Sequence, residues 1–484
     1  MEKVDIALVT KKSIRGIFAL VYRTFSIQVL GFAANFLLTI YLSPSIFGIF
    51  FVVSAAIAFL SYFSDIGLAA ALIQKKEPIT DEELRTTFTI QQALVISLVA
   101  VALLLSGRIG NFYHLDREGI LLFQALLISF FLSSLKTIPS IILERNLNFE
   151  KLVIPQIVES LFFNITVVVF AISGFGVASF TFAVLARGIS GLAAIYLISP
   201  WKIGFGFSKK SASRLLSFGL PFQTNSFLAL IKDDLLIVYL GKVLPLAQVG
   251  YIGFAQKWAF TPLRLIMDNV IRITFPSFSR LQHDKNILGK AVEKSIFVAS
   301  FLIFPSLAGL VVLAPYFIQL IPRYIKWEPA ILSIAFFAIN AALSSISTPL
   351  TNALNAIGKI KITLYLMIFW TVSTWVITPL TIMVFGFNGV SYASAFIALS
   401  VVFVVIISKR FIKFAVFKIL INPFLATIFM GAIIYFLSPL VVKNITMLIL
   451  MIVFGAVIYF STMFALAKNE ILSDIKFVRE NLKK

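Results

Sequence analysis

Residues 227–241 read FLALIKDDLLIVYLG, an apolar segment with one lysine and two aspartates at its centre. A helix that spans a membrane needs about 20 mostly apolar residues, and this segment supplies most of one. A charged side chain at the centre of a bilayer costs roughly 2.5–3.5 kcal/mol on insertion scales. We therefore expect Lys232, Asp233 and Asp234 to face protein or water rather than lipid.

The whole chain has the same apolar character. Of its 484 residues, 60% are hydrophobic and 13% are charged, whereas soluble domains carry about 25% charged residues. This composition predicts an all-α polytopic membrane protein. Apolar runs predict fourteen spans, at 16–42, 46–64, 88–107, 120–143, 152–172, 178–199, 215–240, 249–278, 295–320, 329–356, 362–385, 388–407, 419–438 and 445–467.

The net charge of +20 follows the predicted topology and does not indicate nucleic acid. With the N-terminus in the cytoplasm, cytoplasmic segments hold 28 Lys and Arg residues and external segments hold 6. The positive-inside rule then places both termini in the cytoplasm. Residues 1–15 are too polar for a signal peptide, so the first span is expected to stay as an anchor in the cytoplasmic (inner) membrane.

Cysteine is absent and only His114 and His283 occur, both in predicted loops, so we expect no thiolate or histidine metal site and no cofactor. Charged residues within the predicted spans lie only in the first eight. The seven basic ones are Arg23, Lys136, Arg187, Lys232, Lys257, Arg264 and Arg272, and the four acidic ones are Glu159, Asp233, Asp234 and Asp268. This region of the bundle is predicted to be polar inside and biased towards positive charge.

The span at 249–278 shows how these charges are arranged. At 100° per residue, Lys257, Arg264, Asp268 and Arg272 project within a wedge of about 80°. One interpretation is a wet cavity lined by cations that bind phosphate. The alternative is structural, with Asp268 pairing with Arg264 and Arg272 at a spacing of four residues.

The remaining charges leave similar alternatives open. Lys232 and Asp234 point about 160° apart on a regular helix, so either one of them pairs with a neighbouring helix or the helix is locally unwound. Arg23 is a candidate phosphate ligand that could instead snorkel to the membrane surface. Arg187, near the middle of its span, is a further candidate phosphate ligand. Glu159 is a candidate for ion coupling or for a charge pair between helices, together with the aspartates.

Short repeated motifs indicate that spans 1–6 and 7–12 are related copies. GFGVASF at 174–180 corresponds to GFNGVSY at 386–392, and two further pairs recur at similar offsets. A parallel repeat of this kind predicts two pseudo-symmetric lobes around a central cavity. The predicted domains are an N-lobe at 1–200, a C-lobe at 201–417, two additional spans at 418–467 and a cytoplasmic tail at 468–484.

Several stretches resemble Wzx-type polysaccharide flippases, of the multidrug/oligosaccharidyl-lipid/polysaccharide exporter superfamily. The first is DIGLAAALIQKKEPITDEELRTTF at 65–88. The others are IPSIILERNLNFEKL at 138–152, SFGLPFQTN at 217–225, FPSFSRLQHD at 275–284 and NALNAIGK at 352–359. The resemblance implies two six-helix lobes that form a V around a cavity, plus two extra helices.

The implied activity is not enzymatic. It is the transfer of a polyprenyl-(di)phosphate-linked oligosaccharide from the cytoplasmic to the outer leaflet for O-antigen, capsule or exopolysaccharide synthesis, by alternating access. Expected partners are this glycolipid, membrane lipids, and a polysaccharide polymerase with other assembly proteins. Three alternatives remain open at this stage: a multidrug cation antiporter of the same fold, a membrane-embedded glycan-processing enzyme, and a scramblase without directionality.

Overall fold

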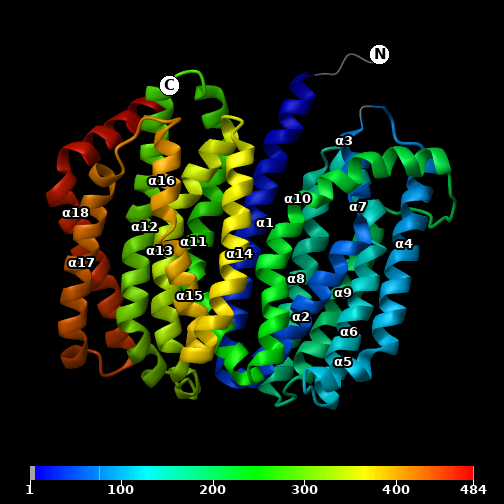
Figure 1. The fold of residues 1–484 in the computed structure, drawn as a ribbon, viewed down its shortest axis with the longest axis horizontal. Coiled ribbons are helices and arrows are strands. Elements are labelled where there is room, and N and C mark those ends of the chain that lie inside the picture. The colour runs from blue at the N-terminus through cyan, green and yellow to red at the C-terminus, as the bar shows by residue number, and fades with distance from the viewer. Residues whose placement is uncertain (1–5, 76, 483–484) are drawn as a thin grey trace. The chain divides into compact units, whose positions relative to one another are not determined.

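The computed structural model describes residues 6–75 and 77–482, and every regular element in these ranges is a helix (Figure 1). The chain divides into two compact units, Met1–Gly250 and Tyr251–Lys484. The helices that begin in the first unit are α1 (Ile6–Tyr41), α2 (Pro44–Asp65), α3 (Leu68–Gln74), α4 (Asp81–Leu104), α5 (Ser106–Phe112), α6 (Arg117–Ser134), α7 (Thr137–Arg145), α8 (Phe149–Ile172), α9 (Ala178–Ile198), α10 (Lys209–Val243) and α11 (Leu246–Leu281). The second unit continues with α12 (Lys285–Leu320), η1 (Ile325–Ala330), α13 (Ile331–Ala356), α14 (Ile360–Phe385), α15 (Asn388–Ala398), α16 (Val401–Lys409), α17 (Val416–Val441) and α18 (Ile445–Leu482).

Within the described residues, twelve helical segments are long and apolar enough to cross a membrane, so the chain is a polytopic helical membrane protein. The two other predicted spans, 215–240 and 249–278, fall in α10 and α11, which have 35 and 36 residues. Both helices are long enough to cross, but each carries several charged residues. The count of fourteen spans therefore remains a prediction.

Several predicted spans are interrupted rather than continuous. The segment 88–107 is divided between α4 and α5, 120–143 between α6 and α7, and 388–407 between α15 and α16. At the break between α15 and α16 the Ser400 hydroxyl oxygen accepts a hydrogen bond from the Trp370 indole N–H at 2.8 Å. Polar side chains thus accompany an interruption that hydropathy alone does not reveal. At the C-terminus, the predicted tail from residue 468 continues α18 up to Leu482.

In the first unit, α8 packs against α1 and α9, and α9 packs against α6. The ring of Phe50 on α2 stacks on that of Phe180 on α9, with centroids 4.1 Å apart. Gly188 on α9 lies against α6, where an added Cβ would meet Ser129 Oγ at 3.1 Å. A small residue at this point lets the two helices approach closely.

Helix α10 packs along α2 and α3 in the first unit. The turn between α2 and α3 has left-handed backbone at Ile66 and Gly67, and a Cβ on Gly67 would lie 2.3 Å from the Gly219 carbonyl oxygen on α10. A Cβ on Gly48 would lie 1.8 Å from the carbonyl oxygen of Leu246. The boundary at residue 200 was predicted from the sequence repeat. Packing groups α10 with the first unit, but packing does not test the repeat, so this boundary stays a prediction.

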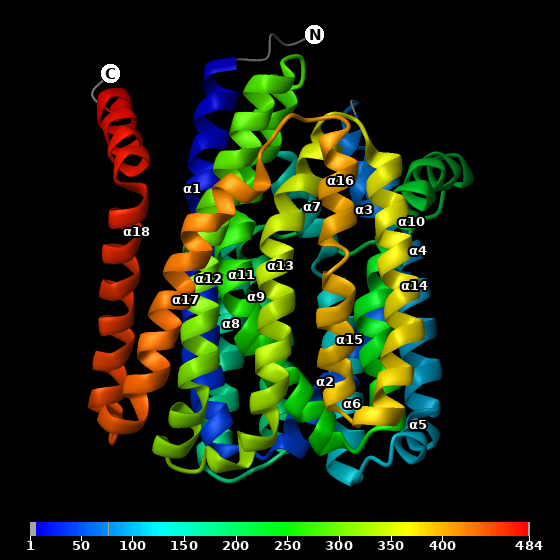
Figure 2. The same cartoon turned by 60° about the vertical axis from the view of Figure 1, so that its left-hand side comes forward.

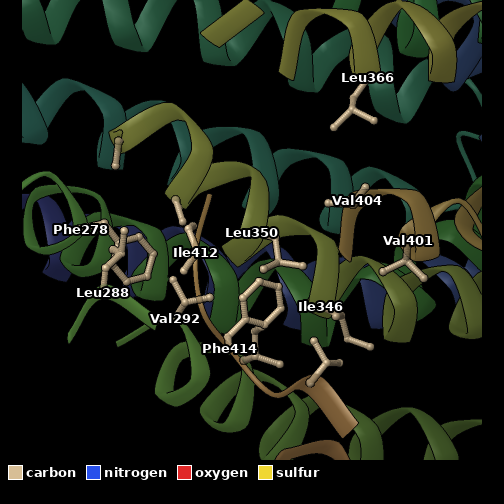
Figure 3. Close-up of a cluster of buried hydrophobic side chains, with 14 residues drawn as sticks. Phe278, Leu288, Val292, Ile346, Leu350, Leu366, Val401, Val404, Ile412 and Phe414 are labelled. Atoms are coloured by element: carbon tan, nitrogen blue, oxygen red, sulfur yellow. The ribbon is translucent and has the colours of Figure 1, made fainter. Parts of the chain in front are cut away.

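Two apolar clusters lie in the described part of the second unit. Figure 3 shows one of them, in which Phe278, Leu288, Val292, Leu350 and Phe414 are nearly or fully buried. The other joins α12 to the last two helices, which lie beside it in Figure 2. There the hydroxyl of the buried Tyr459 on α18 donates to the Phe301 carbonyl on α12 at 2.8 Å.

Candidate intramembrane anion site

The break between α6 and α7 follows from Pro139. Proline has no N–H to donate to the carbonyl four residues earlier, which belongs to Leu135. The Tyr196 hydroxyl on α9 donates to this carbonyl instead, at 3.2 Å. Leu135 and Lys136 form a turn with right-handed backbone angles between the two helices, and α7 starts again at Thr137.

Lys136 sits at this break and forms an ion pair with Glu159 on α8. Its Nζ lies 2.5 Å from Glu159 Oε1, and the two side chains are 13% and 14% exposed. The other carboxylate oxygen of Glu159 lies 3.7 Å from Nε of Arg187 on α9, a side chain that is 57% exposed. One carboxylate thus faces two cations, and the closer of them is the more buried.

Gly191 on α9 provides the space for this carboxylate. A Cβ at that position would lie 2.2 Å from Glu159 Oε1. Any larger residue would therefore displace the Glu159 side chain, because the carboxylate is in direct contact with the helix surface. The small residues near Arg187 serve the position of Glu159 as well as close helix packing.

Arg23 of α1 also contacts α8, near Glu159. Its guanidinium donates to Gln156 Oε1 at 2.7 Å and to the Thr24 hydroxyl oxygen at 3.3 Å. Gln156 and Glu159 are three residues apart on α8, so their side chains project from the same face of this helix. Arg23 is therefore held by a neutral amide, whereas Lys136 is held by a carboxylate.

These groups line one cavity of about 720 Å³ in the first unit. This volume lies within the roughly 300–1,000 Å³ usual for ligand sites. Its charged lining comprises three cations, Arg23, Lys136 and Arg187, and two carboxylates, Glu144 and Glu159, which leaves one positive charge in excess. The polar neutral lining comprises Ser133, Thr137, Ser140, Gln156 and Ser160, and the apolar lining Ile27, Ala69, Ile73, Ile141, Leu152, Pro155, Phe163 and Ile195.

The charged triplet on α10 does not line this cavity. Helix α10 continues without interruption through Lys232, Asp233 and Asp234, so the explanation by local unwinding is wrong. Lys232 Nζ lies 3.1 Å from Asp233 Oδ1, with side chains 28% and 65% exposed. The lysine is paired with its neighbour along the chain, and Asp234 is partly buried.

The four predicted site residues of α11 belong to the second unit. Lys257, Arg264, Asp268 and Arg272 all have exposed side chains. No ion pair joins Arg264, Asp268 or Arg272 to another residue in the part of the chain that the structure describes. The pairing of Asp268 with both arginines is thus not seen, and their guanidinium groups are presented outward from the helix.

A second charged cluster explains the motif at 65–88. Glu83 is 1% exposed and accepts from Lys75 Nζ at 2.9 Å and from Arg214 on α10. Glu83 also completes a capping box with Thr80 at the start of α4. Arg145 on α7 donates to the backbone carbonyls of Leu72, Ile73, Lys75 and Glu77. These contacts join α3, α4, α7 and α10, so Glu83 and Arg145 have a structural role.

Of the ten predicted site residues, three line the cavity: Arg23, Glu159 and Arg187. Sequence reasoning did not identify Gln156, because a single glutamine in an apolar span has no characteristic pattern. It also missed the break at Leu135 and Lys136. Pro139, three residues after Lys136 in the polar stretch SSLKTIPS at 133–140, was the available signal.

A multi-pass helical protein with a charged cavity inside its helical bundle has the architecture of a membrane transporter. The chain belongs to the polysaccharide biosynthesis protein family, whose model matches residues 37–332. This result confirms the resemblance seen in the sequence.

The chain is similar in sequence to two relatives and in fold to one solved structure. It is 26% identical over 346 residues to an uncharacterized membrane protein in the cps region of Klebsiella pneumoniae, which covers 70% of both chains. It is 25% identical over 338 residues to the lipopolysaccharide biosynthesis protein WzxC of Escherichia coli K12, which covers 67% of this chain and 66% of that one. The fold is similar to that of the lipid II flippase MurJ in an inward closed conformation, with a TM-score of 0.77 at 16% identity over 94% of this chain and all of that chain.

Proposed function

We propose that this protein is a flippase for a polyprenyl-(di)phosphate-linked oligosaccharide, which it moves from the cytoplasmic to the outer leaflet for surface polysaccharide synthesis. Membership of the polysaccharide biosynthesis protein family supports this proposal. The observation that carries it is the cavity of the first unit, in which cations outnumber carboxylates by three to two. A lipid phosphate is anionic, and it cannot cross hydrocarbon without compensating charge.

In this proposal Arg23 and Arg187 bind the phosphate oxygens. Guanidinium groups bind phosphate through charge-assisted and often bidentate hydrogen bonds. Arg187 Nε is 3.7 Å from Glu159 Oε2, longer than the roughly 2.7–2.9 Å of a close charge-assisted bond, and its side chain is 57% exposed. Most of its donors are therefore accessible to a ligand.

The neutral polar lining suits the sugar next to the phosphate. Ser133, Ser140, Ser160 and Gln156 offer hydroxyl and amide groups that both donate and accept hydrogen bonds. Sugar hydroxyls require such partners because they also donate and accept. The polyprenyl chain is apolar and stays in the lipid throughout the transfer.

The finer architecture belongs to the same proposal. It has fourteen spans with both termini in the cytoplasm, two six-span lobes that alternate the access of the headgroup between leaflets, and α17 and α18 as additional spans. Arg264 and Arg272 of α11 are further phosphate ligands in this scheme, while Asp233, Asp234 and Asp268 are candidates for ion coupling. A polysaccharide polymerase and other assembly proteins are the proposed partners.

A multidrug cation antiporter is the main rival, and the cavity argues against it. Binding of organic cations requires excess negative charge, whereas this cavity has excess positive charge. The two activities also differ in their phenotypes. Overexpression of an antiporter confers drug resistance, whereas loss of a glycolipid flippase traps an intermediate inside the cell.

The test is deletion of the gene in its native host, followed by analysis of lipid-linked glycans. We expect a polyprenyl-(di)phosphate-linked oligosaccharide to accumulate in the cytoplasmic leaflet and surface glycan to disappear. Complementation with the native chain and with Lys409→Gln should restore export, because Lys409 is an exposed residue remote in sequence from the cavity. Arg187→Gln and Arg23→Gln, at equal protein level, should not. Normal surface glycan after deletion, with no trapped intermediate, would refute the proposed function.

A further inference from the structure

The chain between α9 and α10 is an extended segment attached to the side of α4. Residues 199–208 form no helix. The backbone N–H of Gly206 donates to Thr89 Oγ1 at 3.0 Å, and that of Ser208 donates to Thr86 Oγ1 at 3.1 Å. We call residues 202–207 the strap. Two bonds from alternate residues fix one edge of this segment against α4.

Glycines occupy the inward positions of the strap. A Cβ on Gly204 would lie 3.2 Å from Arg85 Nε, and a Cβ on Gly206 would lie 3.2 Å from Arg85 Cβ. Both glycines therefore lie close against the Arg85 side chain on α4. In an extended chain successive side chains point to opposite sides, so residues 203, 205 and 207 point to the side opposite the two glycines.

These outward positions carry three large apolar side chains. Ile203 is 53% exposed, Phe205 68% and Phe207 67%. The Phe205 ring still contacts the Phe88 ring on α4, with centroids 5.6 Å apart. A contiguous row of apolar side chains on a surface indicates contact with a membrane or with a partner.

The strap and its surroundings carry more basic than acidic residues. Residues 201–214 contain four basic residues and no acidic residue, whereas the adjoining first turn of α4 has the exposed Asp81 and Glu82, and Glu82 accepts a hydrogen bond from Ser211. Arg214 pairs with the buried Glu83, whereas Lys202, Lys209 and Lys210 are exposed. The two lysines after the strap begin α10, whose first turns lie across the end of the first unit in Figure 1.

The position of the strap along the spans places it at a membrane surface. It follows directly on α9, whose spanning segment ends at Ile198, and it contacts α4 at Thr86 and Thr89, within the first turns of the spanning segment Asp81–Leu104. Aromatic side chains at this depth insert at the boundary between headgroups and acyl chains. Lysines beside them reach the phosphate layer.

We propose that the strap and its three lysines form a binding site for anionic phospholipids, with Phe205 and Phe207 between the acyl chains and Lys202, Lys209 and Lys210 on the headgroups. Electrostatic attraction of one lysine to an anionic leaflet corresponds to a preference of roughly five-fold. This surface lies apart from the cavity, whose lining includes no strap residue. The site therefore selects the surrounding lipid and does not depend on the transported substrate.

The absence of cysteine from the chain allows a direct test with the full-length protein. Phe205→Cys, and separately Phe207→Cys, would be labelled with a bimane fluorophore and reconstituted in phosphatidylcholine vesicles. Brominated phosphatidylglycerol or brominated phosphatidylcholine would then be added at equal mole fractions. We expect phosphatidylglycerol to quench either label at least about five-fold more strongly per mole. Replacing Lys202, Lys209 and Lys210 with Gln should lower this ratio to one.

The matched control replaces Lys409, Lys413 and Lys418 with Gln, three exposed lysines of the second unit. These changes remove the same charge and should leave the ratio unchanged. Equal quenching by both lipids in the parent protein would overturn the proposal, as would a ratio that survives the strap substitutions. Quenching by aqueous iodide but not by either brominated lipid would also overturn it, because the strap would then face water.

Discussion

Lys136 Nζ lies 2.5 Å from Glu159 Oε1, and Lys136 belongs to the turn that separates helices α6 and α7. Both side chains are largely buried, so the pair is a fixed part of the cavity wall. Glu159 lies closer to Lys136 than to Arg187, so Lys136 is the cation that this carboxylate compensates most closely. The turn between α6 and α7 therefore carries the lysine whose ion pair holds the Glu159 carboxylate beside Arg187.

Glu159→Gln should destabilise the protein. It leaves the largely buried Lys136 without its carboxylate, and loss of one partner from a buried ion pair costs about 3 kcal/mol or more. The melting temperature in detergent should fall for Glu159→Gln and recover in part when Lys136→Gln is combined with it. Additive effects of the two substitutions would show that the pair makes no energetic contribution.

Gly191→Ala should act through Glu159. The added methyl group would lie 2.2 Å from Glu159 Oε1, so the carboxylate must move away from Lys136. We expect a loss of about 1–3 kcal/mol of unfolding free energy, as for other overpacked sites. In a Glu159→Ala background the same substitution should cost little, because the carboxylate is gone. An equal cost in both backgrounds would place the clash elsewhere.

Part of this arrangement could be anticipated from the sequence, because a charge in an apolar span is costly and must face protein or water. That argument selected Arg23, Glu159 and Arg187, which the fold brings to one cavity. It could not show that Gln156 holds Arg23, since that contact joins residues 133 positions apart. Nor could helical periodicity reveal that Lys136 sits outside a helix, because the hydropathy of 120–143 is unaffected by the break.

The helical periodicity of α11 predicts which side of the helix its charged side chains occupy, but not which ion pairs they form. Its four predicted site residues are all exposed, but the pairs expected at a spacing of four residues are not formed between Arg264, Asp268 and Arg272 in the described part of the chain. Spacing permits such a pair without requiring it, since flexible side chains gain little from an exposed ion pair. The positions were predictable and the contacts were not.

Gly48→Ala should prevent close packing at the first turns of α2. The new Cβ would lie 1.8 Å from the backbone carbonyl oxygen of Leu246, and backbone cannot move aside as a side chain can. We expect a strong loss of folded protein, measured by size-exclusion chromatography in detergent. Gly309→Ala is the matched control on α12, because nothing lies within 4 Å of its Cβ. Normal folding of Gly48→Ala would contradict this helix contact.

The start of α12 should depend on pH through Asp284. Backbone N–H donors of Ile287 and Asn286 lower the pKa of this exposed carboxyl group below 3.8. The folded pKa is depressed, so the stabilisation is present above the unfolded pKa and is lost as pH falls through the folded value. Hydrogen exchange at residues 286–288, corrected for the intrinsic rate, should therefore increase at acid pH.

Asp284→Asn is the control for this effect, because asparagine also caps helices but does not titrate in this range. Its corrected hydrogen exchange at residues 286–288 should be the same at acid pH as at neutral pH. The same acid response in the native chain and in Asp284→Asn would assign the effect to another group.

The central claim is that the cavity of the first unit binds an anionic lipid headgroup through Arg23 and Arg187. Its most direct test is the affinity of purified protein in nanodiscs for a polyprenyl diphosphate, compared between the native chain and Arg23→Gln/Arg187→Gln. Hydrogen bonds to charged groups are worth about 1.5–3 kcal/mol each, so affinity should fall at least ten-fold for each arginine removed. Lys409→Gln/Lys413→Gln should bind like the native chain. Unchanged affinity in the double arginine variant would contradict the account.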